Sequence, residues 1–498
     1  MPGQVAYSVI GFAGLNSFLE AILIESESEV KARLTKDAIL DRENLLKQSA
    51  LHLAVSHPQH LQLLLENGAN VNARDWGGRT PLMYAAAAGA IEVAIALLRG
   101  GADPWIKDNQ YGKEDFINYA IRQEHWDLVM AALDYIRQSA QYSTEQVRSL
   151  LNTAIILWAG ENLKHRRSCQ FKNLLNWGAD PEIRFKEKWE YTQTESNNTL
   201  LHCITNLTDF DTLVTSGFSS FNHSNSTGAH ALMKIAVLCD ARLLQKCVEG
   251  GSRVDHQNHE GRTTLHISLE DVWESFLDVE YDQCEHWTEA MGCAKALLKA
   301  DAYPSSGDLC RCACSNYGCT PAHILLKAHH KFGKYAGSYP LVQYIWSFEW
   351  LHLLKDVKGL ESAKECVLDM LRLAKFEELN LTHTCCRKYH RKGPWHVIDE
   401  DEVFEIMDEE KEMIEDLELQ MRKVEHGLSS NLEEAWMMGL TQLLTARQHI
   451  DSCSGTGLET EVLPLAVEQM THFQYLMNTA PKTEVGATHG RFMGPFKR

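Results

Sequence analysis

The chain has 498 residues, of which 44% are hydrophobic, so it can bury a core in several domains or in one long array. Its 48 basic and 67 acidic side chains leave a formal charge of −19, and a surface of that sign repels the phosphate backbone of nucleic acids. We therefore expect no direct binding to DNA or RNA.

The N-terminus lacks the features of a secretory signal, because the first basic residue is Lys31 and Glu20 interrupts the early apolar stretch. The most apolar long window, 81–98, contains Glu92 and does not read as a membrane span. We expect a soluble intracellular protein, nuclear or cytoplasmic, without membrane contact. Thiols stay reduced there, so the 14 cysteines are not expected to form a disulfide framework.

One short phrase recurs along the chain. It reads ALHLA at 50–54, TPLMYAA at 80–86, TLLHCI at 199–204, HALMKIA at 230–236, TTLHI at 263–267 and TPAHILL at 320–326. A second phrase follows at variable distance, as in LLLENGANVNARDWGG at 63–78 and LLRGGADPWIKDNQYG at 97–112. Gly68 and Gly101 of these two segments lie about one 33-residue period apart, which is typical of a solenoid of stacked units.

These phrases resemble the ankyrin repeat, in which a Thr-Pro-Leu-His phrase, two short helices and a Leu-Leu-x-x-Gly-Ala phrase lead into a turn. Thr80 is expected to cap a first helix, and Pro81 to occupy its first position, where a missing N–H costs nothing. Gly68 and Gly101 are expected to follow second helices in a conformation that glycine adopts readily. The resemblance implies an all-α ankyrin-repeat solenoid of about seven to eight units, some of them degenerate.

The phrases and the composition divide the chain into four parts. We expect N-terminal capping helices at 1–45, the ankyrin-repeat array at 46–330 with insertions near 186–197 and 270–292, an appended C-terminal helical domain at 331–450, and a largely flexible tail at 451–498. Apolar residues at 3-4 spacing from Val403 to Val424 predict an acidic helix there. This helix fits a hairpin packed within the chain or a dimer contact, and the oligomeric state stays open.

The histidines of the recurring phrase do not indicate catalysis. His52, His202, His266 and His323 stand about one repeat or more apart, so each ring is expected to hydrogen-bond the adjoining turn. The sequence contains no nucleophile elbow, phosphate loop, dinucleotide fingerprint, kinase signature or His-Glu-x-x-His motif. We therefore expect no enzyme, no catalytic residue and no organic cofactor.

Binding to other proteins is the function that the resemblance implies, with contacts at the turn tips. The expected contact residues are Trp76, Arg79, Trp105, Tyr111, His256 and His259, together with Trp273 and Trp287 in the acidic-aromatic insertion. Trp105 and Tyr111 fit equally well with packing of turn against turn. The insertion fits either a grip on a basic partner segment or a helix that covers the solenoid.

A cysteine-rich loop, CRCACSNYGC, runs from Cys310 to Cys319 and leads into the last repeat phrase. Three alternatives are open for it: a structural zinc site, free thiols in a tight turn, or a redox-active pair. Zinc requires the loop to curl, because alternate residues of an extended chain are about 6.5–7 Å apart and zinc–thiolate bonds are about 2.3 Å long. The candidate ligands are Cys310, Cys312, Cys314, Cys319, His383, Cys385 and Cys386.

The segments CxCxCSxxGCTP and THTCC also resemble fungal ankyrin-repeat proteins of unassigned biochemistry. Ankyrin proteins include transcription coregulators that hold a DNA-binding partner without touching DNA. We therefore expect a regulatory scaffold of this kind, for example of a fungal gene cluster, with a transcription factor as its partner. A cytoplasmic adaptor or inhibitor, such as a ligase substrate receptor, is the alternative.

Overall fold

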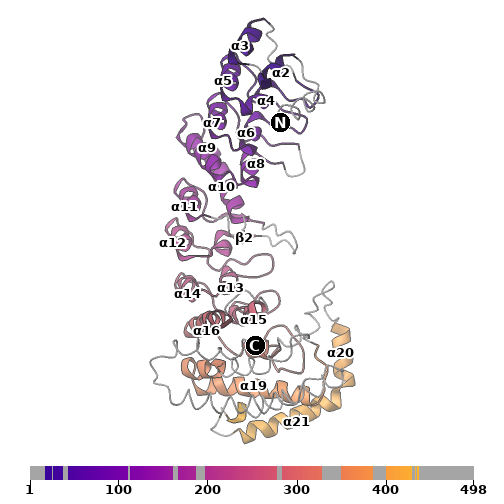
Figure 1. Cartoon of the computed structure of the whole chain (residues 1–498). Helices are drawn as coiled ribbons and strands as arrows, with labels where there is room; N and C mark the ends of the chain where they lie inside the picture. The colour runs from indigo at the N-terminus through magenta and orange to yellow at the C-terminus, as the bar shows by residue number, and fades with distance from the viewer. Residues whose placement is uncertain are drawn as a thin grey trace, which may run out of the picture. The chain divides into compact units, whose positions relative to one another are not determined.

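A computed structural model describes residues 17–24, 26–36, 43–109, 113–160, 167–186, 197–276, 283–327, 349–384, 400–428, 432 and 434–436. Within these residues the chain forms short helices in consecutive pairs, joined by extended turns (Figure 1). The described chain also contains two short strands, β1 (Arg184–Phe185) and β2 (Asn198–Thr199). The prediction of an all-α repeat protein is confirmed.

The chain divides into two compact units, and the first comprises residues 1–194 and 208–219. Its helices are α2 (Ser17–Ile24), α3 (Glu27–Lys36), α4 (Ala50–Leu53), the 3-10 helix η1 (Ala54–Ser56), α5 (Pro58–Glu66), α6 (Pro81–Ala87), α7 (Ile91–Arg99), α8 (Phe116–Arg122), α9 (Trp126–Gln138), α10 (Thr144–Gly160), α11 (Ser168–Asn176) and, from its second residue on, α12 (Leu207–Thr215).

The helix α6 shows why the recurring phrase forms a repeat. Thr80 caps it by accepting a hydrogen bond from the Met83 N–H at 3.4 Å, and Pro81 is its first residue, as predicted. Its residues Leu82, Ala85 and Ala86 are buried where α6 packs on α8. Small side chains let neighbouring repeats approach closely, so the core lies between successive helix pairs.

The turns that follow second helices depend on glycine at defined positions. Gly68 follows α5 with a φ of +83°, and Gly101 follows α7 with a φ of +89°. Side chains other than glycine are strained in this left-handed region, so the predicted role of both glycines is confirmed.

The second unit comprises residues 195–207 and 220–498. Its helices are the 3-10 helix η2 (Leu200–Cys203), α13 (Ala231–Ala236), α14 (Ala241–Glu249), α15 (Thr264–Phe276), α16 (Gln283–Lys299), α17 (Pro321–Lys327), a helical stretch at 349–357, α19 (Leu360–Glu378), α20 (Glu400–Glu409) and α21 (Lys411–Gly427).

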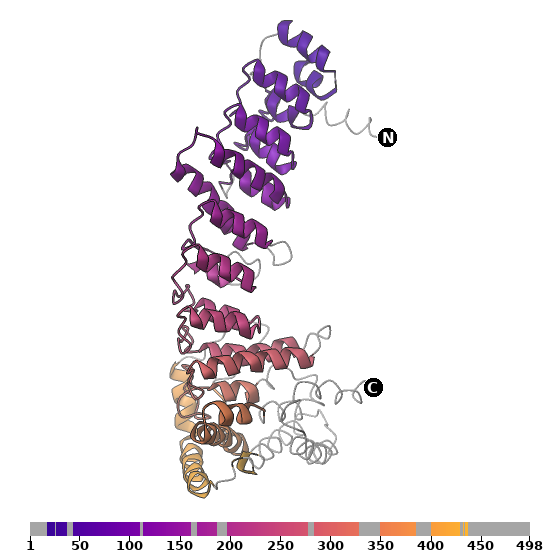
Figure 2. The same cartoon turned by 90° about the vertical axis from the view of Figure 1, so that its left-hand side faces the viewer.

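The insertion near 270–292 lengthens one repeat. α15 has 13 residues and α16 has 17, whereas α13 and α14 of the preceding repeat have 6 and 9. The longer pair is visible in Figure 2 beside its shorter neighbours. The inserted residues therefore continue the two helices of a repeat, and those described do not form a separate covering helix.

The acidic segment after α19 folds onto its own chain. α21 packs on α19, with Leu417 buried and Glu418 paired with Arg372. The helix breaks at Glu410, whose carboxylate accepts hydrogen bonds from the backbone N–H of Thr382 at 3.0 Å and from its hydroxyl at 2.6 Å. The acidic helix therefore packs within its own chain, while residues 437–449, which the hairpin alternative also involves, lie outside the described residues.

Among the described helices none is both long and apolar enough to cross a membrane. The predicted tail at 451–498 and most of the predicted insertion near 186–197 lie outside the described residues.

Candidate functional site

Several of the described turns between repeats are fixed at the base by one carboxylate or amide. The Asp75 Oδ1 atom accepts from the Arg79 N–H at 2.8 Å, and the Asn225 and Asn258 side chains accept in the same way from Ala229 and Arg262, each at 3.0 Å. In each of these three pairs the acceptor and the donor are four residues apart. The turn base is therefore a shared structural element, and it leaves the tip residues free to vary.

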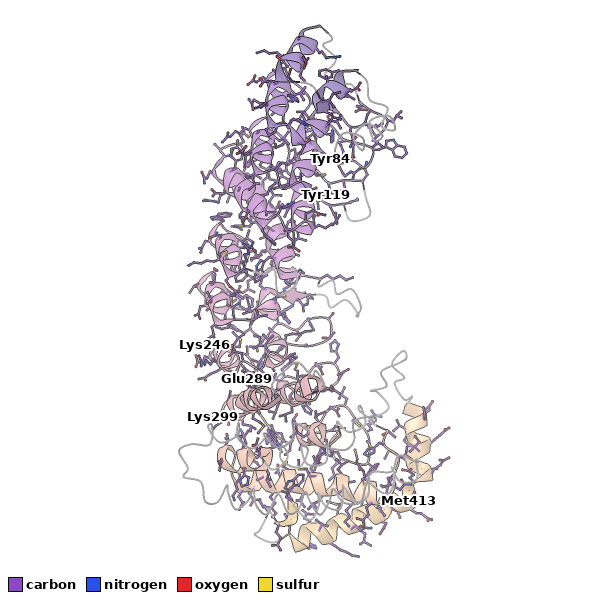
Figure 3. All side chains as sticks on the ribbon, viewed as in Figure 1. Tyr84, Tyr119, Lys246, Glu289, Lys299 and Met413 are labelled. Atoms are coloured by element: carbon purple, nitrogen blue, oxygen red, sulfur yellow. The ribbon has the colours of Figure 1, made fainter. Side chains whose placement is uncertain are left out.

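In two turns of the first unit, a tyrosine of the following helix donates a hydrogen bond to the aspartate at the turn base. Tyr84 donates to Asp75 Oδ2 at 2.8 Å, and Tyr119 donates to Asp108 Oδ2 at 2.7 Å. Figure 3 shows these two tyrosines on successive repeats. Burial, followed by the hydrogen bond to Asp108, raises the pKa of Tyr119, so the phenol stays protonated and keeps donating.

The histidines of the recurring phrase tie one turn to the next, as predicted. The Nδ1 atom of His52 accepts from the Ser49 N–H at 3.1 Å, so its Nε2 donates to the carbonyl oxygen of Arg79 at 2.9 Å. His266 uses Thr263 and the carbonyl of Cys319 in the same way, at 3.1 and 2.9 Å. Burial lowers the pKa of His266 to about 4, so the ring is neutral at physiological pH and structural in its role.

Apolar side chains project from two adjoining turn tips in the first unit. Trp76 is 78% exposed, and Leu45 and Leu46 are 74% and 53% exposed. The Trp76 N–H donates to the Leu46 carbonyl at 3.0 Å, so the two tips lie side by side. We call Leu45, Leu46 and Trp76 the tip patch. An exposed aromatic among leucines is typical of a protein-binding surface.

Two other predicted contact residues of this unit serve the scaffold. Arg79 pairs with Asp75 at 2.9 Å and lies over the Tyr84 ring at 5.5 Å from its centroid. The indole N–H of Trp105 donates to Ser149 Oγ at 3.1 Å, and its ring meets Tyr142 edge-on. Trp105 thus packs on the turn residue Tyr142, as the alternative of packing turn against turn holds, and also on the helix α10. Tyr111 lies outside the described residues.

In the second unit His256 and His259 lie at one turn. The ring of His256 is half-buried, stacks on His230 at 3.4 Å and shares a hydrogen bond of 2.7 Å with the Gly228 carbonyl. His259 is exposed, and its backbone N–H donates to the Thr227 carbonyl at 3.1 Å. Of the two, His259 is the one available to a partner.

Several exposed apolar residues at turn tips of both units were not predicted from the sequence. Leu45 and Leu46 precede the first recurring phrase. Leu309 directly precedes the cysteine loop, and Tyr317, which is 80% exposed, lies within it. The available signal was an apolar residue at a turn position, which sequence alone does not separate from a core residue. For Trp273 and Trp287 the structure gives the helices α15 and α16 that carry them, and their side chains lie outside the described residues.

The cysteine loop is an enlarged version of the same turn. Asp308 Oδ1 accepts from the N–H groups of Cys310 and Cys319 at 2.9 and 2.8 Å. Asp308 and Cys319 are 11 residues apart, against four at Asp75, Asn225 and Asn258 and six at Asp108. The longer interval holds Cys312 and Cys314, so the loop is an insertion at the tip of a normal turn base.

The described members of the predicted ligand set fall into two groups. Within each group the possible ligand atoms lie within 4.8 Å of one another: Asp308, Cys310 and Cys319 in the first, and Cys312, Cys314 and His383 in the second. The first group coincides with the turn base, where Asp308 already accepts two backbone N–H groups. The second has no counterpart in the other described turns, and Cys385 and Cys386 lie outside the described residues.

Three buried thiols elsewhere in the described chain are not activated. Burial raises the pKa of Cys247 to about 12, and it also raises the pKa of Cys293 and Cys366. Thiols with raised pKa values stay protonated and make poor nucleophiles.

Comparison with known proteins identifies the repeat. A family model described as ankyrin repeats, in three copies, matches residues 13–108, a segment that includes α2 through α7. This chain contains ankyrin repeats. The fold expected from the resemblance is therefore confirmed, and ankyrin repeats generally mediate binding to other proteins.

Two curated plant proteins are similar over short segments of the ankyrin region. The ADP-ribosylation factor GTPase-activating protein AGD2 of Arabidopsis thaliana is 39% identical over 94 residues, which is 17% of this chain and 12% of that protein. The related protein AGD4 of the same plant is 44% identical over 63 residues, or 12% of this chain and 8% of that protein. The chain thus spans a small part of either relative, and the likeness indicates common repeats.

Proposed function

We propose that this chain is a non-enzymatic scaffold that binds a partner protein through its ankyrin turns, and that it acts as a transcription coregulator. The observation that carries the proposal is the tip patch, in which Leu45, Leu46 and Trp76 are more than half exposed on a rigid turn base. Rigid aromatic anchors in a preformed surface usually contribute most of the binding energy at an interface.

The tip patch is large enough to matter energetically. Covering an indole removes about 150–250 Å² from water, and at about 25 cal/mol per Å² this corresponds to roughly 4–6 kcal/mol before the costs of association. Trp76 is not fully exposed, so its share lies toward the lower end of that range. A single turn-tip residue thus has a measurable effect on partner affinity.

The charge of the chain supports a basic partner. α20 has six acidic residues among ten, and Phe404 on the same helix is 78% exposed. With a formal charge of −19 for the whole chain, association with a basic protein is favoured over association with a nucleic acid. Basic segments are common in DNA-binding proteins, and this is the reason for choosing the coregulator over the cytoplasmic adaptor.

Paired affinity purification tests the proposal. Full-length wild type, Trp76→Ala and the control Gln62→Ala, which changes an exposed residue of α5, are each purified with their bound proteins. We expect a DNA-binding protein that is recovered with wild type and Gln62→Ala, and at least about tenfold less with Trp76→Ala. Recovery of the same proteins with all three would contradict a role for the tip patch.

Fluorescence microscopy of the tagged full chain separates the two regulatory readings. Nuclear signal is the expected result. Exclusion from the nucleus under every condition would end the coregulator proposal and favour the adaptor alternative.

A further inference from the structure

We propose that Cys312, Cys314 and His383 bind a structural zinc ion that joins the loop of the last ankyrin turn to the segment after α19. This proposal is independent of the proposed function and goes beyond it. The three side chains come from two chain segments about seventy residues apart, and their ligand atoms lie within 4.8 Å of one another. Two thiolates and an imidazole form a donor set that zinc prefers.

The distances fit a tetrahedral ion with small adjustments. Zinc bonds of about 2.3 Å to sulfur and about 2.0–2.1 Å to nitrogen place neighbouring ligand atoms roughly 3.6–3.8 Å apart. The Cys312 Sγ and His383 Nδ1 atoms are 3.9 Å apart. The curl that the sequence required for a shared ion is present between Cys312 and Cys314, where the Ser315 N–H donates to the Cys312 carbonyl at 3.2 Å.

Residues outside the cysteine loop position the segment that carries Cys312 and Cys314. The Arg372 Nε–H of α19 donates to the Ala313 carbonyl at 3.0 Å, and Ser315 Oγ donates to Asp369 Oδ1 at 3.2 Å. His323 Nε2 lies 3.3 Å from the carbonyl oxygen of Cys314. The carbonyls of Ala313 and Cys314 and the hydroxyl of Ser315 are thus positioned by side chains that are not ligands, as a preorganised metal site requires.

Neighbouring residues also position the histidine. His383 Nε2, the nitrogen that faces away from Cys312, lies 3.5 Å from the buried Glu377 Oε1, and the ring packs on Phe376 at 4.6 Å between centroids. The preceding residue, Thr382, donates twice to Glu410. Metal-binding histidines commonly direct the second ring nitrogen toward a carboxylate, which fixes the tautomer and strengthens the ligand.

The simplest structural explanation of this cluster is that buried cysteines fill space as small apolar side chains. That reading suits Cys366, which lies in the core of α19. It does not explain why an imidazole and a carboxylate are directed to the same buried place as Cys312 and Cys314. The group of Asp308, Cys310 and Cys319 differs again, since the turn base accounts for it without an ion.

The proposal rests on the three described ligands. Structural zinc takes four ligands, and the sequence prediction of Cys385 or Cys386 for the remaining position is separate from this proposal. Binding would convert two thiols to thiolates, release their protons to solvent and leave the site electrically neutral with a neutral imidazole.

Elemental analysis of the full chain, purified without chelator from zinc-supplemented cells, tests the site. We expect about one equivalent of zinc in wild type and in the matched control Cys319→Ser, and less than about a tenth in Cys314→Ser and His383→Gln. Wild type with less than about a tenth of an equivalent, or loss of zinc in Cys319→Ser with retention in Cys314→Ser, would overturn the proposal.

A second measurement, made on the wild-type protein, tests the site even if the variants fail to fold. Wild-type protein loaded with Co²⁺ in place of zinc should show the visible absorption of a tetrahedral site together with thiolate-to-metal charge-transfer bands. An octahedral spectrum without thiolate bands would overturn the assignment, whatever the variants do.

Discussion

Two turns of this protein have the same kind of base and differ in their tips. In the first unit Asp75 accepts from Arg79 four residues later, and the short tip presents Trp76 to solvent. In the second unit Asp308 accepts from Cys319 eleven residues later, and the inserted residues are held by α19. The ankyrin turn base thus tolerates an insertion, and the tip can serve either a partner or the chain itself.

The support behind each turn differs in the same way. Asp75 is held by Tyr84 of its own repeat, so the first turn is complete within a local segment. In the last repeat the Asp369 carboxylate of α19 accepts from Ser315 at 3.2 Å and from Thr320 at 2.6 Å, and it lies 2.8 Å from His323. The last turn therefore depends on contacts that are distant in sequence. Four substitutions, two of them with matched controls, can test this difference.

The largest effect is expected for Asp369→Ala. Burial by itself would raise the pKa of Asp369, but His323 and the hydrogen bonds from Thr320 and Ser315 outweigh it and lower that pKa. Removing a mostly buried carboxylate with three partners should lower the free energy of unfolding by about 3 kcal/mol, measured by urea denaturation of the full chain at pH 7. The contribution is present above the ordinary carboxyl pKa and is lost as pH falls below about 4.

The matched control is Asp301→Asn. Asp301 is exposed and pairs with Lys358 at 3.1 Å, and asparagine tolerates its positive φ of 71°. We expect a change below about 0.5 kcal/mol. Equal losses in the two variants would show that Asp369 does not organise the last turn.

Next comes the pH dependence due to His266. Burial lowers its pKa to about 4 in the folded state, against about 6.5 when unfolded, so the unfolded chain binds a proton first as pH falls. Stability should decline by up to about 3 kcal/mol between pH 6.5 and 4, and His266→Gln should remove that part of the decline. Urea denaturation at a series of pH values measures it, and an unchanged pH profile in the variant would refute the assignment.

A smaller loss is expected at the cap of α6. Thr80→Ala removes a side-chain acceptor from a buried N-cap, which should cost about 1 kcal/mol in free energy of unfolding. Thr153→Ala is the control, because Thr153 lies half-buried within α10 and bonds a carbonyl of its own helix. If both variants lose the same amount, capping is not the cause.

The smallest effect on stability is expected for Trp76→Ala. Its side chain is 78% exposed, so the free energy of unfolding should change by less than about 0.5 kcal/mol. Stability near that of wild type together with impaired partner recovery would mark a binding residue. A loss above about 2 kcal/mol would instead identify Trp76 as part of the scaffold.

The repeat was predictable because its signals are local. The cap at Thr80, the glycines Gly68 and Gly101 and the phrase histidines each make contacts within one or two repeats, and their roles followed from the recurring phrase. The extension of α15 and α16 is local as well, but the sequence did not show that the insertion would lengthen both helices.

The contacts of the cysteine loop were less predictable. Loop spacing indicated that the thiols must curl to share an ion, but the division between the Asp308 group and the Cys312 group depends on Asp369, Arg372 and Glu410. These residues lie roughly 50–100 positions further along the chain, and no local pattern marks them as partners of the loop. The exposure of Leu45 and Leu46 was hidden for the same reason, since burial is a property of the folded neighbourhood, whereas Trp76 was predicted from its place at a turn tip.

Site-specific photo-crosslinking in cells tests most directly whether the tips of the first ankyrin turns carry the function. A photoreactive amino acid is placed at position 76 in one full-length protein and at the exposed position 62 of α5 in another. We predict an adduct with one DNA-binding protein at position 76 and none at position 62. Adducts of equal yield at both positions, or none at position 76 while the partner still co-purifies, would contradict the account.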